Sequence, residues 1–156
     1  MRGRERLEAY LREHKVRYNA TSHPEAYTAQ EVAAAEHVPG RQVAKVVMAN
    51  ADGRLVMLVL PAPARVDLVR LRTALGAKMV RLAGEEEFTS VFPDCDVGAM
   101  PPFGNLYNVP VYMDRSLGNA PQIVFNAGTH RETITVAVAD YQRLAGPTII
   151  EFAGPR

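Results

Sequence analysis

Hydrophobic and polar positions near the start of the chain follow a helical repeat. Apolar or aromatic side chains recur every three or four residues, with charged residues between them, at Leu7, Tyr10, Leu11 and His14. This spacing predicts an amphipathic helix within residues 2–15, and residues 16–20 are typical of a short extended segment. Thr28 and Glu31 are spaced as in a capping box, which predicts a second helix that ends before Pro39.

The pattern then changes to one that is typical of β-strands. Residues 43–50 and 54–60 are rich in valine, leucine and methionine, and Ala51-Asp52-Gly53 separates them. An Asp-Gly pair readily adopts the positive φ angles that a tight hairpin turn requires. The sequence therefore predicts a β-hairpin in this region.

Shorter elements fill the rest of the chain. A helix is predicted over residues 66–75, with Asp67 near its start and Gly76 after its end, and a shorter helix over residues 85–92. Residues 94–108 are rich in glycine and proline and are predicted to form a loop. The remaining runs predict strands at 78–82, 111–114, 122–127, 132–138 and 148–152 and a helical turn at 140–144. Because strands outnumber helices and follow one another without regular crossovers, we expect an α+β fold. Its sheet should be mixed, mostly antiparallel, with helices packed against it.

The composition is that of an ordinary globular domain. The chain has 156 residues, of which 47% are hydrophobic and 22% charged, so a disordered chain is excluded and one core can stabilise the fold. No apolar stretch approaches the ~20 residues of a membrane span, and the N-terminus lacks the apolar core of a secretory signal. We therefore expect one cytoplasmic domain over residues 1–156, with no membrane partner.

The charge balance limits the possible partners. The chain carries 18 Lys and Arg against 17 Asp and Glu, a net charge of +1. This argues against coating of a nucleic-acid duplex but leaves room for a local basic patch. Two basic sets either contact phosphates or are solvated helix faces: Arg2, Arg4, Arg6, Arg12, Lys15 and Arg17, and then Arg65, Arg70, Arg72, Lys78 and Arg81.

Several familiar catalytic motifs do not occur in the sequence. It has no glycine-rich phosphate loop, no dinucleotide fingerprint and no Gly-x-Ser-x-Gly nucleophile turn. Its histidines lack the spacing of a zinc site, and a single cysteine excludes a disulfide framework. That residue, Cys95, stands between Asp94 and Asp96, which should raise the pKa of its thiol and disfavours a role as nucleophile.

Lys45 is an unusual residue in the first strand of the predicted hairpin. Strand alternation places its side chain on the same face as those of Val43 and Val47. A lysine among apolar neighbours costs free energy unless its ammonium group meets water, a partner or a ligand. Two interpretations follow. Lys45 either extends to water at a sheet edge, or it is a cationic donor in a cleft, directed at a phosphate or an ester carbonyl.

Two glycine-containing segments are further candidates. Gly98-Ala-Met-Pro-Pro-Phe-Gly104 is either a rigid connector or a stiff loop whose N–H groups hold a carbonyl or oxyanion. Asn126-Ala-Gly-Thr-His130 follows an apolar strand, and Gly128 would let a substrate approach the backbone. His130 is either a structural residue or a group that hydrogen-bonds a substrate and transfers a proton near neutral pH.

Lys45 and these two segments, in this order, resemble one family. The chain is similar to the YbaK-like aminoacyl-tRNA deacylases, which include the editing insertion domain of prolyl-tRNA synthetase, over about residues 20–152. The resemblance implies an α+β domain around a curved mixed sheet. It also implies hydrolysis of the ester that joins a wrong amino acid to the 3′-terminal adenosine of tRNA, without a metal or organic cofactor.

The resemblance also assigns roles to individual residues. Lys45 matches the strand lysine that holds the terminal phosphate or ribose, and Gly98 and Pro102 match the loop whose backbone binds the aminoacyl carbonyl. His130 matches a histidine that only some members carry. The predicted catalytic residues are thus Lys45, Gly98 and His130. The predicted substrate-binding residues are Pro102, Gly104, Asn126 and Gly128. Four residues near the matched loops are added because of their position, and each either lines the substrate pocket or takes part in ordinary loop packing: His23, Thr28, Met100 and Phe103.

Three functions fit these residues. We expect a free-standing deacylase of mischarged tRNA, with tRNA(Pro) carrying Ala, Ser, Thr or Cys as the expected substrate and prolyl-tRNA synthetase as a further partner. The second is a non-catalytic module that binds aminoacyl-tRNA or a synthetase. The third is a hydrolase of a smaller acyl ester, with no nucleic-acid partner.

Overall fold

The predicted hairpin forms the centre of a five-stranded sheet. The computed structural model describes residues 2–23, 29–36 and 38–155. Strands β2 (Ala44–Ala51) and β3 (Arg54–Pro61) pair antiparallel, and the turn between them has positive φ angles at Asp52 and Gly53. The sheet has the order β5-β2-β3-β6-β9, with β5 (Val80–Leu82) antiparallel to β2 and the other two strands, β6 (Val111–Asp114) and β9 (Thr148–Ile150), parallel to β3.

A second sheet lies next to the first. Strands β1 (Tyr18–Ser22), β8 (Glu132–Ala137) and β7 (Gln122–Asn126) pair antiparallel in that order. A single bridge between Val43 and Val124 joins the start of β2 to β7. Among the described strands, five of the seven pairings are antiparallel, so the predicted α+β class with mixed, mostly antiparallel pairing is confirmed.

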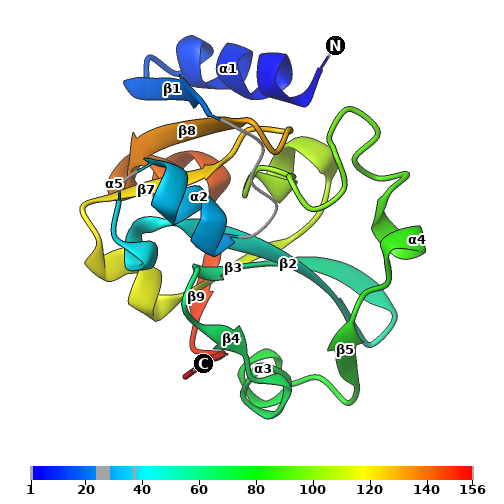
Figure 1. Cartoon of the computed structure of the whole chain (residues 1–156). Helices are drawn as coiled ribbons and strands as arrows, with labels where there is room; N and C mark the ends of the chain where they lie inside the picture. Colours follow the sequence, from blue (N-terminus) through cyan, green and yellow to red (C-terminus); the bar gives the residue numbers. More distant parts are fainter. Residues whose placement is uncertain (1, 24–28, 37, 156) are drawn as a thin grey trace.

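Helices cover both faces of the five-stranded sheet. The described α-helices are α1 (Gly3–Glu13), α2 (Ala29–Glu36), α3 (Leu68–Leu75), α4 (Glu85–Phe88) and α5 (Val138–Ala145). Figure 1 shows α1 beside β1 and β8 at one end of the molecule and α3 at the other. Within the described residues, every helix is too short or too polar to cross a lipid bilayer.

The continuous apolar run of β3 follows from this two-sided cover. Met57 and Val59 point into the core that contains the apolar face of α1, whereas Leu58 and Leu60 pack with Leu71 of α3. A strand that is buried on both faces loses the usual alternation of polar and apolar residues. The position of β3 at the centre of the molecule thus accounts for its composition.

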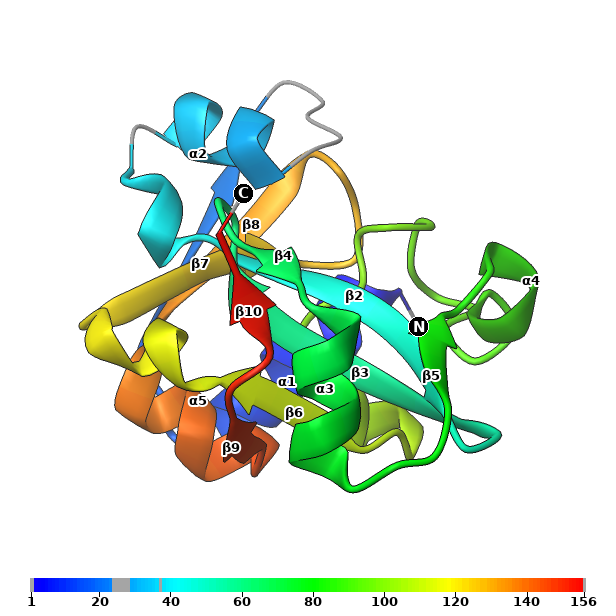
Figure 2. The same cartoon turned by 90° about the horizontal axis from the view of Figure 1, so that it is seen from below.

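Several element boundaries differ from the sequence-based predictions. Helix α3 starts at Leu68 rather than at residue 66, because the Asp67 carboxylate accepts hydrogen bonds from the first free N–H groups of the helix. Residues Arg65–Val66 instead form β4, which pairs with β10 (Ala153–Gly154). Figure 2 shows these two strands next to each other, near α3. Helix α4 ends at Phe88 and strand β9 at Ile150, so both are shorter than predicted.

The buried carboxylate of Asp114 holds the C-terminal segment in place. Its Oδ1 atom accepts hydrogen bonds from the backbone N–H groups of Phe152 and Ala153, both at 2.8 Å. Its Oδ2 atom accepts from the N–H and the hydroxyl of Ser116. Burial opposes ionisation of this group, but the hydrogen bonds outweigh burial and lower the pKa of Asp114 below its ordinary value.

We predict that Asp114→Asn lowers the free energy of unfolding at pH 7 by about 2–3 kcal/mol, because an amide cannot accept all of these hydrogen bonds. A group with a depressed folded-state pKa stabilises the fold above its unfolded pKa. That contribution is lost as pH falls through the folded pKa. Urea titrations from pH 7 to pH 3 should therefore show a smaller acid-induced loss in the variant. Asp140→Asn, which removes a surface ion pair with Arg143, should change stability by less than about 1 kcal/mol.

Candidate functional site

Three segments that are distant in the sequence enclose one small cavity. The start of β2, the loop around Gly98 and the end of β7 contribute most of its walls, and α2 contributes one residue. The cavity has a volume of about 160 Å³ and is lined by Val32, Val43, Ala44, Lys45, Val46, Gly98, Met100 and Asn126. The structure thus brings together four of the residues predicted from the sequence: Lys45, Gly98, Met100 and Asn126.

Lys45 lies where β2 passes from one sheet to the other. On one side β2 pairs with β3, where Lys45 faces Leu60. On its other side β2 contacts β7 at Val43 and pairs with β5 from Ala49 onward. Lys45 lies between the contact with β7 and the pairing with β5, and it lines the cavity. Lys45 therefore lies at the cavity, as the cleft interpretation requires.

The loop around Gly98 is a turn fixed by backbone hydrogen bonds. The N–H of Ala99 donates to the carbonyl oxygen of Asp96 at 3.0 Å, and Gly98 within this turn has a φ of 83°. Residues with a side chain rarely adopt such an angle, so glycine is needed here. Two further bonds tie the loop to the β7–β8 turn: Asp96 N–H donates to the Gly128 carbonyl, and Gly128 N–H donates to the Ala99 carbonyl.

The loop also has backbone N–H groups in residues that line the cavity. Within the described part of the chain, the N–H groups of Gly98 and Met100 donate no backbone hydrogen bond. Both residues line the cavity, and Met100 is almost fully buried. Backbone N–H groups of this kind can hold a carbonyl oxygen or an oxyanion without reorganisation.

His130 lies behind the loop. It is buried, and its Nε2 atom is 2.9 Å from the carbonyl oxygen of Val97. A Cβ atom on Gly98 would lie 3.6 Å from the Cε1 atom of its ring. His130 therefore supports the turn that carries Gly98, and the residues given above as the cavity lining do not include it.

Asn126 ends β7 with a buried polar atom. Its Oδ1 atom has no hydrogen-bond partner among the described residues. Strand alternation puts its side chain on the same face as Val124, which packs with Val32 and Val43. A buried amide oxygen without a partner costs about 1–3 kcal/mol, so a ligand in the cavity would relieve this cost.

Comparison with known proteins identifies the family of this chain. The model of the aminoacyl-tRNA editing domain family matches residues 23–144, which is most of the chain. The chain belongs to this family. Proline–tRNA ligases from Streptococcus pneumoniae, among them those of strains Hungary19A-6 and CGSP14, are 32% identical to the editing domain over 104 residues. These residues are 67% of this chain but only 17% of each ligase.

Solved structures share the fold of the editing domain. A crystal structure described as that of a candidate trans-editing enzyme for prolyl-tRNA synthetase has a TM-score of 0.84 at 21% identity, covering 97% of both chains. A hypothetical protein has a TM-score of 0.86 at 18% identity, covering 96% of this chain and 99% of its own. At these identities the likeness shows the fold alone, and it confirms the fold that the sequence resemblance implies.

Three of the predicted loop residues lie outside the cavity of the editing domain. Phe103 is fully buried, and its ring centroid lies 5.3 Å from that of Tyr141 and 5.7 Å from that of Phe125. The Pro102 carbonyl accepts a hydrogen bond of 2.8 Å from the Tyr141 hydroxyl. A Cβ atom on Gly104 would lie only 2.7 Å from the Val109 carbonyl oxygen. The structure therefore places these residues where they anchor the loop to the core.

Two of the remaining predicted residues lie around the β7–β8 turn, and one lies outside the residues that the structure describes. Gly128 has a φ of 94°, and a Cβ atom on it would lie 3.2 Å from the backbone nitrogen of Arg4 in α1. The backbone N–H of His23 donates to the Arg131 carbonyl at 2.8 Å. Thr28 lies outside the described residues.

The valines that line the cavity, Val32, Val43 and Val46, were not predicted as site residues. Val32 reaches the cavity only through the tertiary packing of α2.

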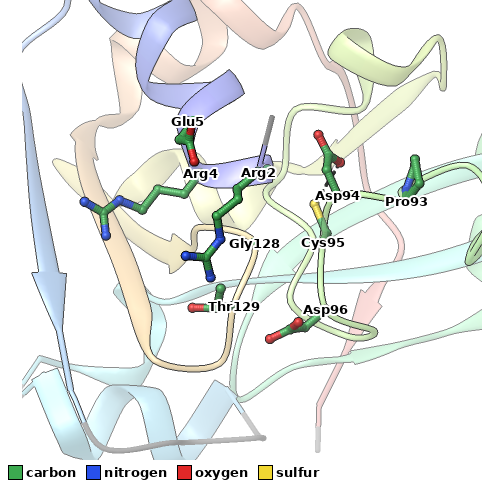
Figure 3. Close-up of a pocket in the computed structure, with 10 residues that line it drawn as sticks. Arg2, Arg4, Glu5, Pro93, Asp94, Cys95, Asp96, Gly128 and Thr129 are labelled. Carbon is green, nitrogen blue, oxygen red and sulfur yellow. Dashed lines mark hydrogen bonds between the residues drawn. The ribbon is translucent and has the colours of Figure 1, made fainter.

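A larger cavity of about 490 Å³ lies on the other side of Gly128, and Figure 3 shows its lining. There the Asp94 carboxylate accepts hydrogen bonds from Arg6 and Tyr107, which anchors α1 to the loop. Burial raises the pKa of the neighbouring Cys95 thiol to about 11, with a smaller contribution from Asp94. The predicted direction of this shift is confirmed, but burial is its main cause. Arginine and carboxylate residues both line this cavity, as the labels in Figure 3 show.

We predict that Phe103→Ala lowers the free energy of unfolding by about 3–5 kcal/mol, because it opens a void in the core next to Tyr141. Urea denaturation would measure this change. Leu106→Ala, at a half-buried position one turn away, should cost clearly less. Equal stabilities of the Phe103 variant and the wild type would show that the ring is not a core group.

Proposed function

We propose that this editing domain hydrolyses the ester between a wrongly attached amino acid and the 3′-terminal adenosine of tRNA. The observation that carries the proposal is that Lys45 lines the same small cavity as Gly98 and Met100, whose N–H groups donate no backbone hydrogen bond among the described residues. Such a set binds the negative and partially negative oxygens of an ester substrate. Membership of the editing domain family supports the same reaction.

Lys45 and the Gly98 loop have separate tasks in the proposed reaction. The Lys45 ammonium group binds the terminal phosphate or the ribose end of the tRNA. The N–H groups of Gly98 and Met100 bind the ester carbonyl oxygen, on which negative charge develops as the carbonyl carbon becomes tetrahedral. Their positions are set by the fixed turn before the substrate arrives, so little reorganisation is needed.

A water molecule is the nucleophile in this mechanism. Its oxygen adds to the ester carbonyl carbon, the bond from that carbon to the ribose oxygen breaks, and the ribose oxygen takes up a proton. The products are the free amino acid and tRNA with a free hydroxyl. The second ribose hydroxyl orients the water. Cys95 does not fit as a nucleophile, because its thiol has a raised pKa and lines the other cavity.

His130 and Pro102 act through the loop. The ring of His130 contacts the Val97 carbonyl on one side of Gly98, and Tyr141 holds the Pro102 carbonyl on the other. We assign to His130 a positioning role for the Gly98 amide. This role is weaker than that of Lys45, which contacts the substrate itself.

The size of the cavity favours small amino acids. A volume of about 160 Å³ between valine walls accommodates side chains such as those of Ala, Ser, Thr or Cys. The similarity to proline–tRNA ligases supports tRNA(Pro) as the carrier and prolyl-tRNA synthetase as the partner that supplies the mischarged substrate in the cytoplasm. One methylene group alone changes the preference by only ~1–3 kcal/mol.

A deacylation panel tests the proposal. It uses tRNA(Pro) and tRNA(Ala), each charged with Ala, Ser, Thr, Cys or Pro, and follows the loss of the ester against the uncatalysed rate. Fast release of a small amino acid, with prolyl-tRNA(Pro) left intact, is the expected result. Tight binding of every charged tRNA without hydrolysis would favour a binding module instead.

We predict that Lys45→Ala lowers the deacylation rate by about 10²–10³-fold, the usual effect of losing one donor to a developing negative charge. Lys45→Met keeps the aliphatic stem and should lose as much activity, because the charge rather than the packing is removed. Both variants should unfold at nearly the wild-type temperature. His130→Ala should slow the reaction less, since it acts only through the loop. Wild-type deacylation by Lys45→Met would remove this residue from the reaction.

We predict that salt separates tRNA from a smaller ester as the substrate. Because contacts with phosphates release counterions, the KM for charged tRNA should rise about tenfold or more between 50 and 200 mM salt. The KM for an aminoacyl-adenosine ester should change less than about twofold over the same range. Equal salt dependence of both substrates would indicate a small-ester hydrolase that does not recognise RNA.

A further inference from the structure

Asn126 is a polar residue at a position where the surrounding packing is apolar. Its neighbour on the same face of β7 is Val124, which is 1% exposed and packs with Val32 and Val43. An apolar side chain at position 126 would extend this cluster into the cavity. The chain instead carries an amide whose buried Oδ1 atom has no hydrogen-bond partner in the part of the chain that the structure describes.

The cavity lining also contains hydrogen-bond donors. Lys45 contributes an ammonium group, and Gly98 and Met100 contribute backbone N–H groups. Among the described side chains that line the cavity, Asn126 supplies the only oxygen atom. It is therefore the one side-chain group there that can accept a strong hydrogen bond.

An aminoacyl ester requires one acceptor as well as several donors. Its carbonyl oxygen and the tRNA phosphates accept hydrogen bonds, whereas its α-ammonium group only donates them. We propose that the Asn126 Oδ1 atom accepts a hydrogen bond from this α-ammonium group, so that the site selects esters of amino acids whose amino group is free. This inference rests on the deacylase function proposed above and names the part of the substrate that the cavity recognises.

A neutral amide suits this position better than a carboxylate. Asp at position 126 would face the same cavity as Lys45 and form an ion pair with it, which would take the lysine away from the phosphate. Asn126 provides an acceptor without adding a negative charge to the cavity that Lys45 lines. The same geometry discriminates against esters whose amino group is acylated or missing, because the Oδ1 atom then stays without a partner.

The test compares two esters of the same tRNA, alanyl and propionyl, which differ only in the α-amino group. After correction for uncatalysed hydrolysis, the wild type should hydrolyse the alanyl ester about 10²-fold faster than the propionyl ester. Asn126→Leu should reduce this ratio to about threefold or less. Gln122→Leu, on the same face of β7 but exposed and outside the cavity, should keep the wild-type ratio.

Thermal unfolding separates recognition from a structural role. Asn126→Leu should melt at the wild-type temperature or above it, because leucine joins the apolar cluster and a buried oxygen without a partner is removed. Asn126→Ser serves as a second variant with a small polar group. Lower melting temperatures in both variants, together with an unchanged preference for the alanyl ester, would overturn the proposal.

A binding measurement keeps the outcome independent of hydrolysis. The probes are 3′-alanylamino-3′-deoxyadenosine, whose amide bond resists hydrolysis, and its propionylamino counterpart. The wild type should bind the alanyl compound about tenfold more tightly, and Asn126→Leu should bind both equally. If neither ester is hydrolysed but this preference depends on Asn126, recognition stands and the deacylase function fails. If the alanyl ester is hydrolysed and the preference survives in Asn126→Leu, recognition fails and the deacylase function stands.

Discussion

The candidate site depends on two backbone hydrogen bonds that join the Gly98 loop to the β7–β8 turn. The Asp96 N–H donates to the Gly128 carbonyl, and the Gly128 N–H donates to the Ala99 carbonyl. These two bonds fix the position of a loop that has no regular secondary structure. Because Asn126 lies two residues before Gly128, the same bonds set the loop amides relative to the end of β7. The bridge between Val43 and Val124 sets the position of Lys45 relative to the same turn, because Lys45 follows Val43 by two residues.

The aromatic core fixes the other end of the loop. Phe103 packs against Phe125 and Tyr141, and the Tyr141 hydroxyl binds the Pro102 carbonyl. Burial of these rings stabilises the protein and also restricts the loop between residues 98 and 104. These stabilising contacts lie at Pro102 and Phe103, whereas the N–H groups of Gly98 and Met100 donate no backbone hydrogen bond within the described residues.

Local sequence patterns predicted the parts of the structure that local physics determines. The hairpin follows from an apolar run on each side of Asp52-Gly53, and the cap at Asp67 and the end at Gly76 follow from single residues. The same patterns could not reveal β4, which has two residues and exists only because the C-terminal segment returns to it. They also could not show that Met100 reaches the cavity wall whereas Phe103, in the same buried core cluster, does not. Tertiary packing decides this difference.

Polar groups between apolar walls raise the free energy of the folded protein when they have no hydrogen-bond partner. Apolar walls at Val32, Val43 and Val46 lower the local polarity, which strengthens any hydrogen bond formed there and makes an unsatisfied group more expensive. A protein can keep such groups only if the rest of the fold is stable enough, and here the two-sided burial of β3 and the carboxylate of Asp114 supply that stability. In the proposed reaction, donors at Lys45 and the loop and an acceptor at Asn126 match the two kinds of polar group in an aminoacyl ester. The binding of the correct ester then offsets a cost that the free protein bears, and an ester without the amino group offsets only part of it.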